Sequence, residues 1–261
     1  MTPNKISFKV LGIFGIVNVQ RIPKKEKMAK ESKAQLIIYN ILNPLIVGMH
    51  KIGVTPNMIT SIGFILNIVA AVIFIIGAEQ ADRTDMFYVG WGGFTILIAG
   101  LFDMMDGRLA RIANLSSSFG AFYDSVMDRY SELVMFLGIC FYLISQDYFL
   151  SSLFAFVALI GSIMVSYIRA RAEGIGVDCS VGMMQRPARV VTIGASAMFC
   201  GIIYYFTGHF KFELNNPIFT YFETISIFTL PVTFVAIMAN YTAFQRLMHV
   251  KKVLEKKDSN A

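Results

Sequence analysis

Four aspartates between residues 103 and 128 have the residue types and the spacing for metal chemistry. Asp103 and Asp106 are three residues apart, and Asp124 and Asp128 are four apart. On a helix, each of these spacings places both side chains on one face. A short hairpin over residues 114–118 would make the two helices antiparallel neighbours. The sequence therefore predicts that the four carboxylates converge.

Carboxylates at such close range repel one another, and a divalent cation removes the repulsion. All-oxygen ligand sets suit Mg²⁺ or Mn²⁺. Two ions would fit four carboxylates and could clamp a diphosphate. The alternative is a set of interfacial acids that pair with Arg108, Arg111 and Arg129.

Two glycines and an arginine accompany the acids. Gly107 and Gly120 carry no side chain, so the backbone there can approach a ligand closely. Arg111 lies within about two helical turns of the acids and can bind phosphate oxygens in a bidentate way. This combination favours the metal-site interpretation over a set of paired surface acids.

The elements that must position these residues are long apolar segments. Hydrophobic residues make up 56% of the 261, and only 15% are charged, whereas soluble domains are nearer a quarter charged. Disorder, collagen-like repeats and an ordinary soluble enzyme are excluded. A helix needs roughly 20 apolar residues to cross a bilayer. The sequence predicts an all-α integral membrane protein with six transmembrane helices, near residues 57–78, 86–104, 131–146, 149–168, 190–208 and 218–245, the third starting as early as Ser118.

Basic residues predict the orientation of these helices. Of the Lys and Arg residues, all but Arg83 and Lys211 fall before the first span, after the second, after the fourth or after the sixth. Cytoplasmic loops carry such an excess. We therefore expect a multi-pass protein of the cell membrane with both termini and the acids on the cytoplasmic side. The basic residues that give the net charge of +6 would then face the membrane surface, and no nucleic-acid partner is expected.

Apolar residues recur at helical spacing over residues 32–50, which predicts an interfacial amphipathic helix before the first span. A plain cytosolic linker is the alternative. The expected organisation is a cytoplasmic basic N-terminal segment (1–31), a six-helix domain with its juxtamembrane helix (32–246) and a cytoplasmic basic C-terminal tail (247–261).

The acidic segment resembles the signature of a known family. It reads Asp-x-x-Asp-Gly-x-x-Ala-Arg, then eight residues, then Gly-x-x-x-Asp-x-x-x-Asp. At every fixed position this string has the residue found in the signature of the CDP-alcohol phosphotransferases, also called CDP-alcohol phosphatidyltransferases, and the segment therefore resembles that family. The six-span plan and the helix before it resemble the family too. The resemblance implies an enzyme that moves a substituted phosphate from a CDP-linked donor to an alcohol and releases CMP.

The resemblance also implies a role for each residue of the motif. Asp103, Asp106, Asp124 and Asp128 would hold the metal, two ions of Mg²⁺ or Mn²⁺, and Asp128 would also act as general base. Residues 55–60 resemble the family's first span, and locally Thr55 and Pro56 suit a helix start. The implied CDP-binding residues are Asn57, Thr60, Asp106, Gly107, Ala110, Arg111 and Gly120.

The segment 166–173, Ser-Tyr-Ile-Arg-Ala-Arg-Ala-Glu, resembles the branch that makes phosphatidylinositol phosphate or its archaeal ether-lipid counterpart. That resemblance implies that arginines here bind the phosphate of the acceptor: Arg169, Arg171, Arg186 and Arg189. Ordinary positive-inside charge is the alternative. The branch commonly has Glu-Arg-Pro-Glu-Arg where residues 185–189 read Gln-Arg-Pro-Ala-Arg. Glycerol phosphate, free inositol and other alcohols therefore stay open beside myo-inositol phosphate.

Together these observations predict transfer of a phosphatidyl group from CDP-diacylglycerol to a polar alcohol, first of all myo-inositol phosphate. Phosphatidylglycerophosphate or phosphatidylinositol synthesis is the alternative within the family. An ion or solute transporter is the alternative from a different class, because buried acids can mark an ion path. The acids lie at a helix end rather than mid-membrane, and no inverted repeat is visible, which favours the enzyme. The resemblance also implies a homodimer.

Overall fold

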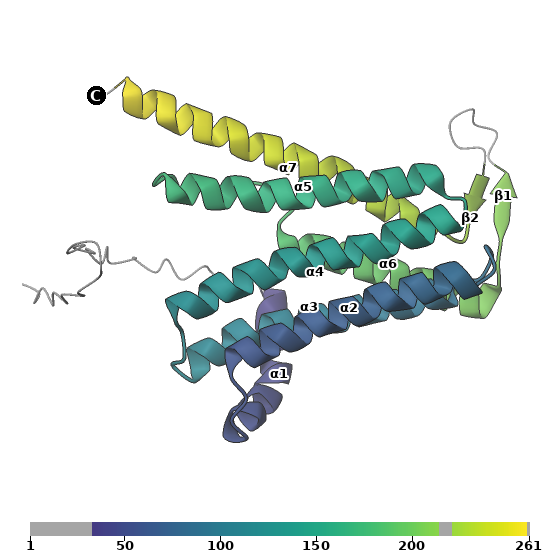
Figure 1. Ribbon diagram of the computed structural model, residues 1–261, viewed down its shortest axis with the longest axis horizontal. Helices are drawn as coiled ribbons and strands as arrows, with labels where there is room; N and C mark the ends of the chain where they lie inside the picture. The colour runs from purple at the N-terminus through teal and green to yellow at the C-terminus, as the bar shows by residue number, and fades with distance from the viewer. Residues whose placement is uncertain (1–32, 214–220, 260–261) are drawn as a thin grey trace, which may run out of the picture. The chain divides into compact units, whose positions relative to one another are not determined.

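The computed structural model describes residues 33–213 and 221–259 (Figure 1). The chain divides into two units, Met1–Ile41 and Leu42–Ala261, and each is described by itself. In the first unit the described residues are helical and open helix α1 (Lys33–Lys51). The basic segment predicted over residues 1–31 lies outside the described residues.

The second unit is built of helices and one short hairpin, so the predicted all-helical class is confirmed. After the end of α1 come α2 (Pro56–Gln80), α3 (Phe87–Ile112), α4 (Ser118–Ser145), α5 (Phe149–Gly174), α6 (Arg186–Thr207), strands β1 (Lys211–Glu213) and β2 (Tyr221–Glu223), and α7 (Ser226–Asp258). α4 begins at the predicted Ser118. α1 agrees with the helix predicted over residues 32–50 to within one residue, although its place at a membrane surface stays a prediction.

Among the described residues, five helices are long and apolar enough to cross a membrane: α2, α3, α5, α6 and α7. α4 has 28 residues, but four charged residues fall within its first 15: Asp124, Asp128, Arg129 and Glu132. The count of six spans therefore stays a prediction.

The predicted start of the last span at residue 218 is wrong. Residues 218–220 lie outside the described part of the chain, Tyr221–Glu223 form β2, and α7 begins only at Ser226. β2 pairs antiparallel with β1, with Phe212 opposite Phe222. A short apolar run fits a strand as well as the first turns of a helix, so hydropathy alone extended the span too far.

Several helices continue past the apolar runs that predicted them. α3 runs to Ile112 and α5 to Gly174, each beyond the predicted end of its span. α7 likewise continues as a helix through most of the predicted C-terminal tail. These extensions matter for function, because the one on α3 carries Asp106, Gly107, Ala110 and Arg111 of the acidic motif.

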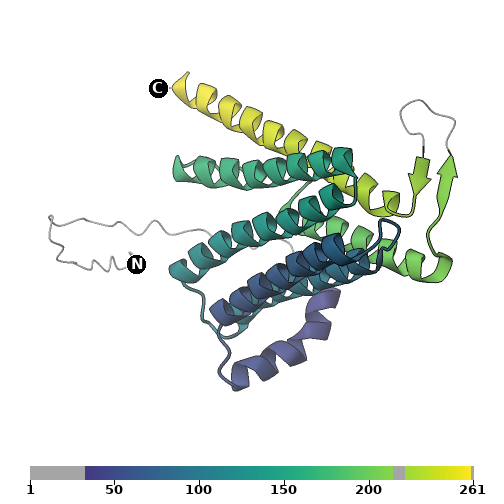
Figure 2. The same ribbon diagram turned by 45° about the vertical axis from the view of Figure 1, so that its right-hand side comes forward.

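Helix pairs pack closely where one helix has a glycine at the contact. Figures 1 and 2 show α2 beside α3 and α5 beside α7, in agreement with the contacts of these pairs. α3 also packs against α6, where a Cβ added to Gly201 would lie 2.4 Å from Gly90 Cα. The two backbones therefore touch. This contact fixes the helix that carries Asp103 against the helix that begins at Arg186.

The end of α1 within the second unit supports α2 and α3 near the acids. Ile46 of α1 is buried in a cluster with Ile59 of α2 and with Met105 and Leu109 of α3. Met105 and Leu109 flank Asp106 along the helix. The apolar face of this part of α3 is thereby fixed, and its acidic face is turned the other way.

The glycine contact predicts a selective loss of stability. Gly201→Ala places a methyl group against the α3 backbone and should lower the free energy of unfolding by about 1–3 kcal/mol. Gly63→Ala is the matched control, because its Cβ would meet Ala99 O and Phe102 Cβ at 3.6 Å, an ordinary contact. That change should alter stability by less than about 1 kcal/mol. Thermal unfolding in detergent measures both, and equal midpoints would contradict the packing argument.

Candidate active site

Two capped helix starts bring the sides of the site together. Thr55 accepts a hydrogen bond from Met58 N at 3.4 Å and Pro56 occupies the first turn of α2. Ser117 accepts a hydrogen bond from Gly120 N at 2.9 Å at the start of α4. Near these starts, Ser61 Oγ lies 2.9 Å from Tyr123 OH, which links α2 to α4.

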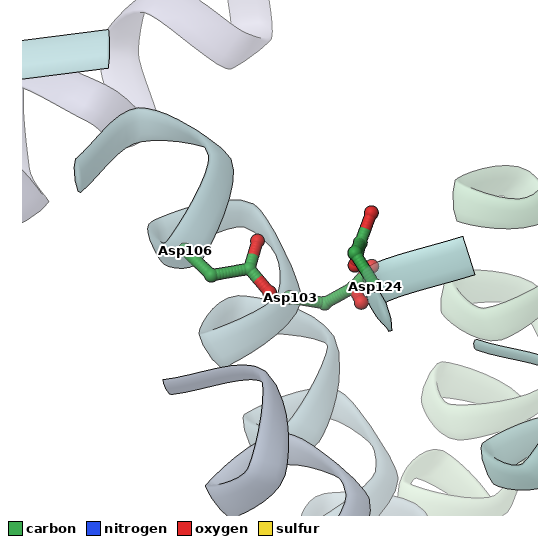
Figure 3. Close-up of side chains that lie close together, drawn as sticks. All are labelled: Asp103, Asp106 and Asp124. Carbon is green, nitrogen blue, oxygen red and sulfur yellow. The ribbon is translucent and has the colours of Figure 1, made fainter. Parts of the chain in front are cut away.

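Three carboxylates converge between α3 and α4. One oxygen from each of Asp103, Asp106 and Asp124 lies within 4.8 Å of the others. Figure 3 shows the Asp103 and Asp106 side chains leaving α3 toward that of Asp124 on α4. Asp106 is only 5% exposed. Its oxygens accept hydrogen bonds from Thr60 Oγ1 at 2.6 Å and from Gly107 N.

This cluster fits a hard divalent cation. Its donors are all carboxylate oxygens, the ligands that Mg²⁺ and Mn²⁺ prefer. The two hydrogen bonds to Asp106 come from neutral groups, so they orient the carboxylate without balancing its charge. Thr60 thus has a specific task, which is to hold one oxygen of Asp106 in place.

Asp128 lies outside the group of three and faces α6. Arg186 Nη1 is 2.9 Å from Asp128 Oδ1 and also donates to Asp103 Oδ2. The guanidinium therefore bridges the last aspartate of the motif and the first. The roles of Asp128 as fourth metal ligand and as general base stay predictions.

A pocket of about 390 Å³ opens beside the carboxylates, and its lining comes from α2, α3, α4 and the α3–α4 loop. The implied CDP-binding residues in its wall are Asn57, Thr60, Asp106, Gly107, Ala110 and Gly120. Asp124 lines it too. The pocket and the cluster of three carboxylates are therefore continuous.

The two motif glycines contribute differently to this pocket. A Cβ on Gly107 would meet no protein atom within 4 Å and would stand in the open space of the pocket. A Cβ on Gly120 would lie 3.0 Å from Ser117 Oγ and 3.4 Å from Asn57 Oδ1. Gly107 thus keeps the pocket free, and Gly120 lets α4 begin close to α2.

Arg111 is the implied CDP-binding residue that does not line the pocket. It is exposed in the last turn of α3. Arg108, one turn earlier, donates a hydrogen bond from Nε to Asn43 Oδ1 of α1 at 3.3 Å. The contact of Arg111 with a nucleotide stays a prediction.

The four arginines predicted for the acceptor lie in different surroundings. Arg169 pairs with Glu173 at 2.9 Å on an exposed face of α5, and Arg171 is exposed in the last turn. Arg186 faces the acids. Arg189 is buried and pairs with Glu132 of α4. Of the four, Arg186 is the one that the structure places against the motif.

Sequence reasoning missed two buried charges. Glu132 was not singled out, although an acid four residues after Asp128 within an apolar run needs a partner. Arg246 was counted only among the basic residues that follow the sixth span, yet it is 3% exposed and donates a hydrogen bond from Nε to Val181 O at 2.9 Å. Because several lysines follow Arg246, the sequence does not distinguish this buried arginine from the exposed charges of the tail.

Comparison with known proteins shows the family to which the chain is similar. A family model for CDP-alcohol phosphatidyltransferase matches residues 53–235. The phosphatidylinositol phosphate synthase of Mycobacteroides abscessus is 31% identical over 166 residues, 62% of this chain and 70% of the relative. The archaetidylinositol phosphate synthase of Methanothermobacter thermautotrophicus is 29% identical over 162 residues, 62% of this chain and 74% of the relative. A crystal structure of phosphatidylinositol phosphate synthase from Mycobacterium tuberculosis with CDP-DAG bound superposes with a TM-score of 0.63 at 25% identity, covering 81% of this chain and 94% of that one.

The carboxylate cluster predicts cation binding that can be measured without any substrate. Asp124→Asn removes one charged ligand of three and should weaken Mn²⁺ binding at least tenfold, read by electron paramagnetic resonance of free Mn²⁺ during titration. Asp147→Asn is the control, because Asp147 is exposed in the α4–α5 turn at the opposite end of α4. Equal affinities in the two variants would show that the cluster is not a cation site.

Proposed function

This chain belongs to the CDP-alcohol phosphatidyltransferase family of membrane enzymes that synthesise phospholipids, and we propose that it transfers a phosphatidyl group from CDP-diacylglycerol to a polar alcohol. The resemblance drawn from the motif over residues 103–128 is thus confirmed at the level of the family. One observation carries the proposal. Asp106 and Asp124 belong both to the carboxylate cluster and to the wall of the adjacent pocket.

In this proposal the pocket binds the CDP part of the donor. We assign the cytidine to the part of the pocket between Asn57, Gly107 and Gly120, with the diphosphate toward Asp106 and Asp124. Asp103, Asp106 and Asp124 would hold the divalent cation, with Asp128 as a further ligand of a second ion. When bound, the cation supplies positive charge that neutralises the diphosphate and makes CMP a good leaving group.

Asp128 is the general base in this proposal. The acceptor hydroxyl oxygen forms a bond to the phosphorus that carries the diacylglycerol, and the bond from that phosphorus to the CMP oxygen breaks. The hydroxyl proton passes to a carboxylate oxygen of Asp128. Arg186 lies 2.9 Å from this carboxylate, so it keeps a positive charge beside the reacting atoms.

The acceptor that we propose is myo-inositol phosphate, giving phosphatidylinositol phosphate. Relatives about 30% identical are inositol phosphate lipid synthases by name. An arginine beside the reacting centre suits a phosphorylated acceptor, because a guanidinium binds phosphate oxygens in pairs. Arg186 lies beside Asp128 and is the arginine that we assign to the acceptor phosphate. Arg169 and Arg171 are assigned to the same side of the protein as auxiliary charges, whereas the charge of Arg189 is balanced by buried Glu132.

The proposal includes a membrane arrangement. Six helices, α2 to α7, cross the bilayer, with both termini and the site on the cytoplasmic side. α1 lies along the membrane surface, where its exposed apolar side chains Leu45 and Val47 would enter the lipid headgroup region. A two-chain donor lipid can then reach the pocket from the bilayer while the acceptor arrives from water. We also assign the enzyme a homodimeric state on its family resemblance.

The decisive assay is CMP release by the purified protein in liposomes that contain CDP-diacylglycerol. We would supply myo-inositol phosphate, glycerol 3-phosphate, inositol and serine in separate reactions. The expected result is release with myo-inositol phosphate that stops on addition of EDTA and returns with excess Mg²⁺. Release with another acceptor alone would overturn the acceptor assignment, and release that resists EDTA would overturn the metal requirement.

Asp128→Asn tests the general base. Loss of the proton acceptor should lower kcat by about 100-fold or more, while the melting temperature in detergent stays within a few degrees of wild type. Asp147→Asn again serves as the control and should keep full activity. Unchanged turnover in Asp128→Asn would remove this residue from the mechanism.

Gly120→Ala tests the donor pocket. The added methyl group lies close to Ser117 Oγ and Asn57 Oδ1, so it should push α4 away from α2 and narrow the fit of the nucleotide. We expect a rise of about tenfold in the KM for CDP-diacylglycerol with little change in the KM for the acceptor. Gly63→Ala should change neither constant. A rise in the acceptor KM alone would contradict the placement of CDP.

A further inference from the structure

A second ion pair lies one helical turn beyond the pair between Asp128 and Arg186. Glu132 follows Asp128 by four residues on α4, and Arg189 follows Arg186 by three residues on α6. Arg189 donates hydrogen bonds from Nε, at 3.2 Å, and from Nη2 to Glu132 Oε1. The side chains of Arg189 and Glu132 are 1% and 3% exposed. The two ion pairs are stacked along the same two helices.

These ion pairs connect helices that have other principal neighbours. In the described residues α6 packs mainly on α3 and α7, and α4 packs mainly on α2 and α5. Long side chains therefore bridge the gap between α4 and α6. Glu132 and Arg189 are the buried members of that bridge, and removal of one partner would leave the other as an uncompensated buried charge.

Arg189 also fixes the chain that leads into α6. Its Nη1 donates a hydrogen bond to Met184 O at 2.9 Å, two residues before the helix starts. Its Nη2 is 3.5 Å from Ser162 O of α5. One guanidinium thus joins α4, α5 and the first turn of α6. Glu132 is the acid that balances its charge and sets its direction.

This arrangement determines where Arg186 lies. Arg186 stands on the first turn of α6, and it reaches Asp103 and Asp128 only while that turn keeps its position and rotation. We propose that Glu132 is a positioning residue for the acceptor side of the site: through Arg189 it fixes the first turn of α6 and presents Arg186 to the acids. This inference rests on the proposed function for its kinetic consequence, but its structural part can be tested without turnover.

Hydrogen exchange measured by mass spectrometry tests the structural part. In Glu132→Gln, the amides of residues 185–190 should exchange at least tenfold faster than in wild type, while peptides from α2 keep their rates. The control is Gln146→Leu. Gln146 is also buried, at the other end of α4, and donates hydrogen bonds to Gly77 O and Ala81 O. This variant should lower the melting temperature and leave residues 185–190 protected.

Kinetics test the consequence for the site. Glu132→Gln should raise the acceptor KM about tenfold and leave the KM for CDP-diacylglycerol unchanged, because the described lining of the donor pocket includes no residue of α6. A merely structural role would lower the active fraction and thus the maximal rate, with both KM values at wild-type levels. Gln146→Leu is expected to show that second pattern.

A double variant covers the case in which Glu132→Gln fails to fold. Glu132→Gln with Arg189→Met removes both charges, so no unpaired ion stays buried. It should fold, yet exchange at residues 185–190 should still be fast. Wild-type protection there, in either variant, would overturn the inference, as would an unchanged acceptor KM in folded Glu132→Gln. Failure of wild type to release CMP with any acceptor would instead refute the proposed function, and the exchange data would still decide the positioning.

Discussion

Repulsion among carboxylates is the constraint around which this structure is organised. Asp103, Asp106 and Asp124 hold oxygens within 4.8 Å of one another, in surroundings that exclude much of the water. Such an arrangement is costly unless positive charge stands close by. Arg186 supplies part of it at Asp103, and the oxygen-rich donor set suits a cation for the remainder. The helix packing around the site serves to hold these charges in place.

Backbone contact between helices supplies the necessary precision. Gly201 meets Gly90 where α3 crosses α6, and a Cβ on Gly138 of α4 would lie 2.6 Å from Ala71 Cα of α2. Both contacts lie in the apolar parts of these helices, several turns from the acids. Small residues let two helices approach until the backbones touch, which leaves little freedom to slide. Contacts far from the acids thereby fix the positions of the helix ends that carry them.

The sequence was most informative where the chemistry is local. Spacings of three and four residues predicted which faces of α3 and α4 carry the acids, because helix periodicity depends only on the backbone. The same logic could not pair Glu132 with Arg189, which are far apart along the chain and meet only in the folded protein, where their long side chains bridge α4 and α6. It also failed at β2, because an apolar run of a few residues fits a strand or a helix equally well.

In the proposed function, the donor and acceptor sides of the site are built from different elements. The pocket assigned to the nucleotide is lined by the starts of α2 and α4 and the end of α3. The arginine that faces the acids from the other side comes from α6, which a separate buried ion pair ties to α4. Under this proposal, changes near the start of α6 would alter how the acceptor alcohol is held and would leave the nucleotide pocket unchanged. Such a division would explain physically how one carboxylate motif can serve transfer to chemically different acceptors. It would also explain why the motif alone identifies the reaction better than the acceptor.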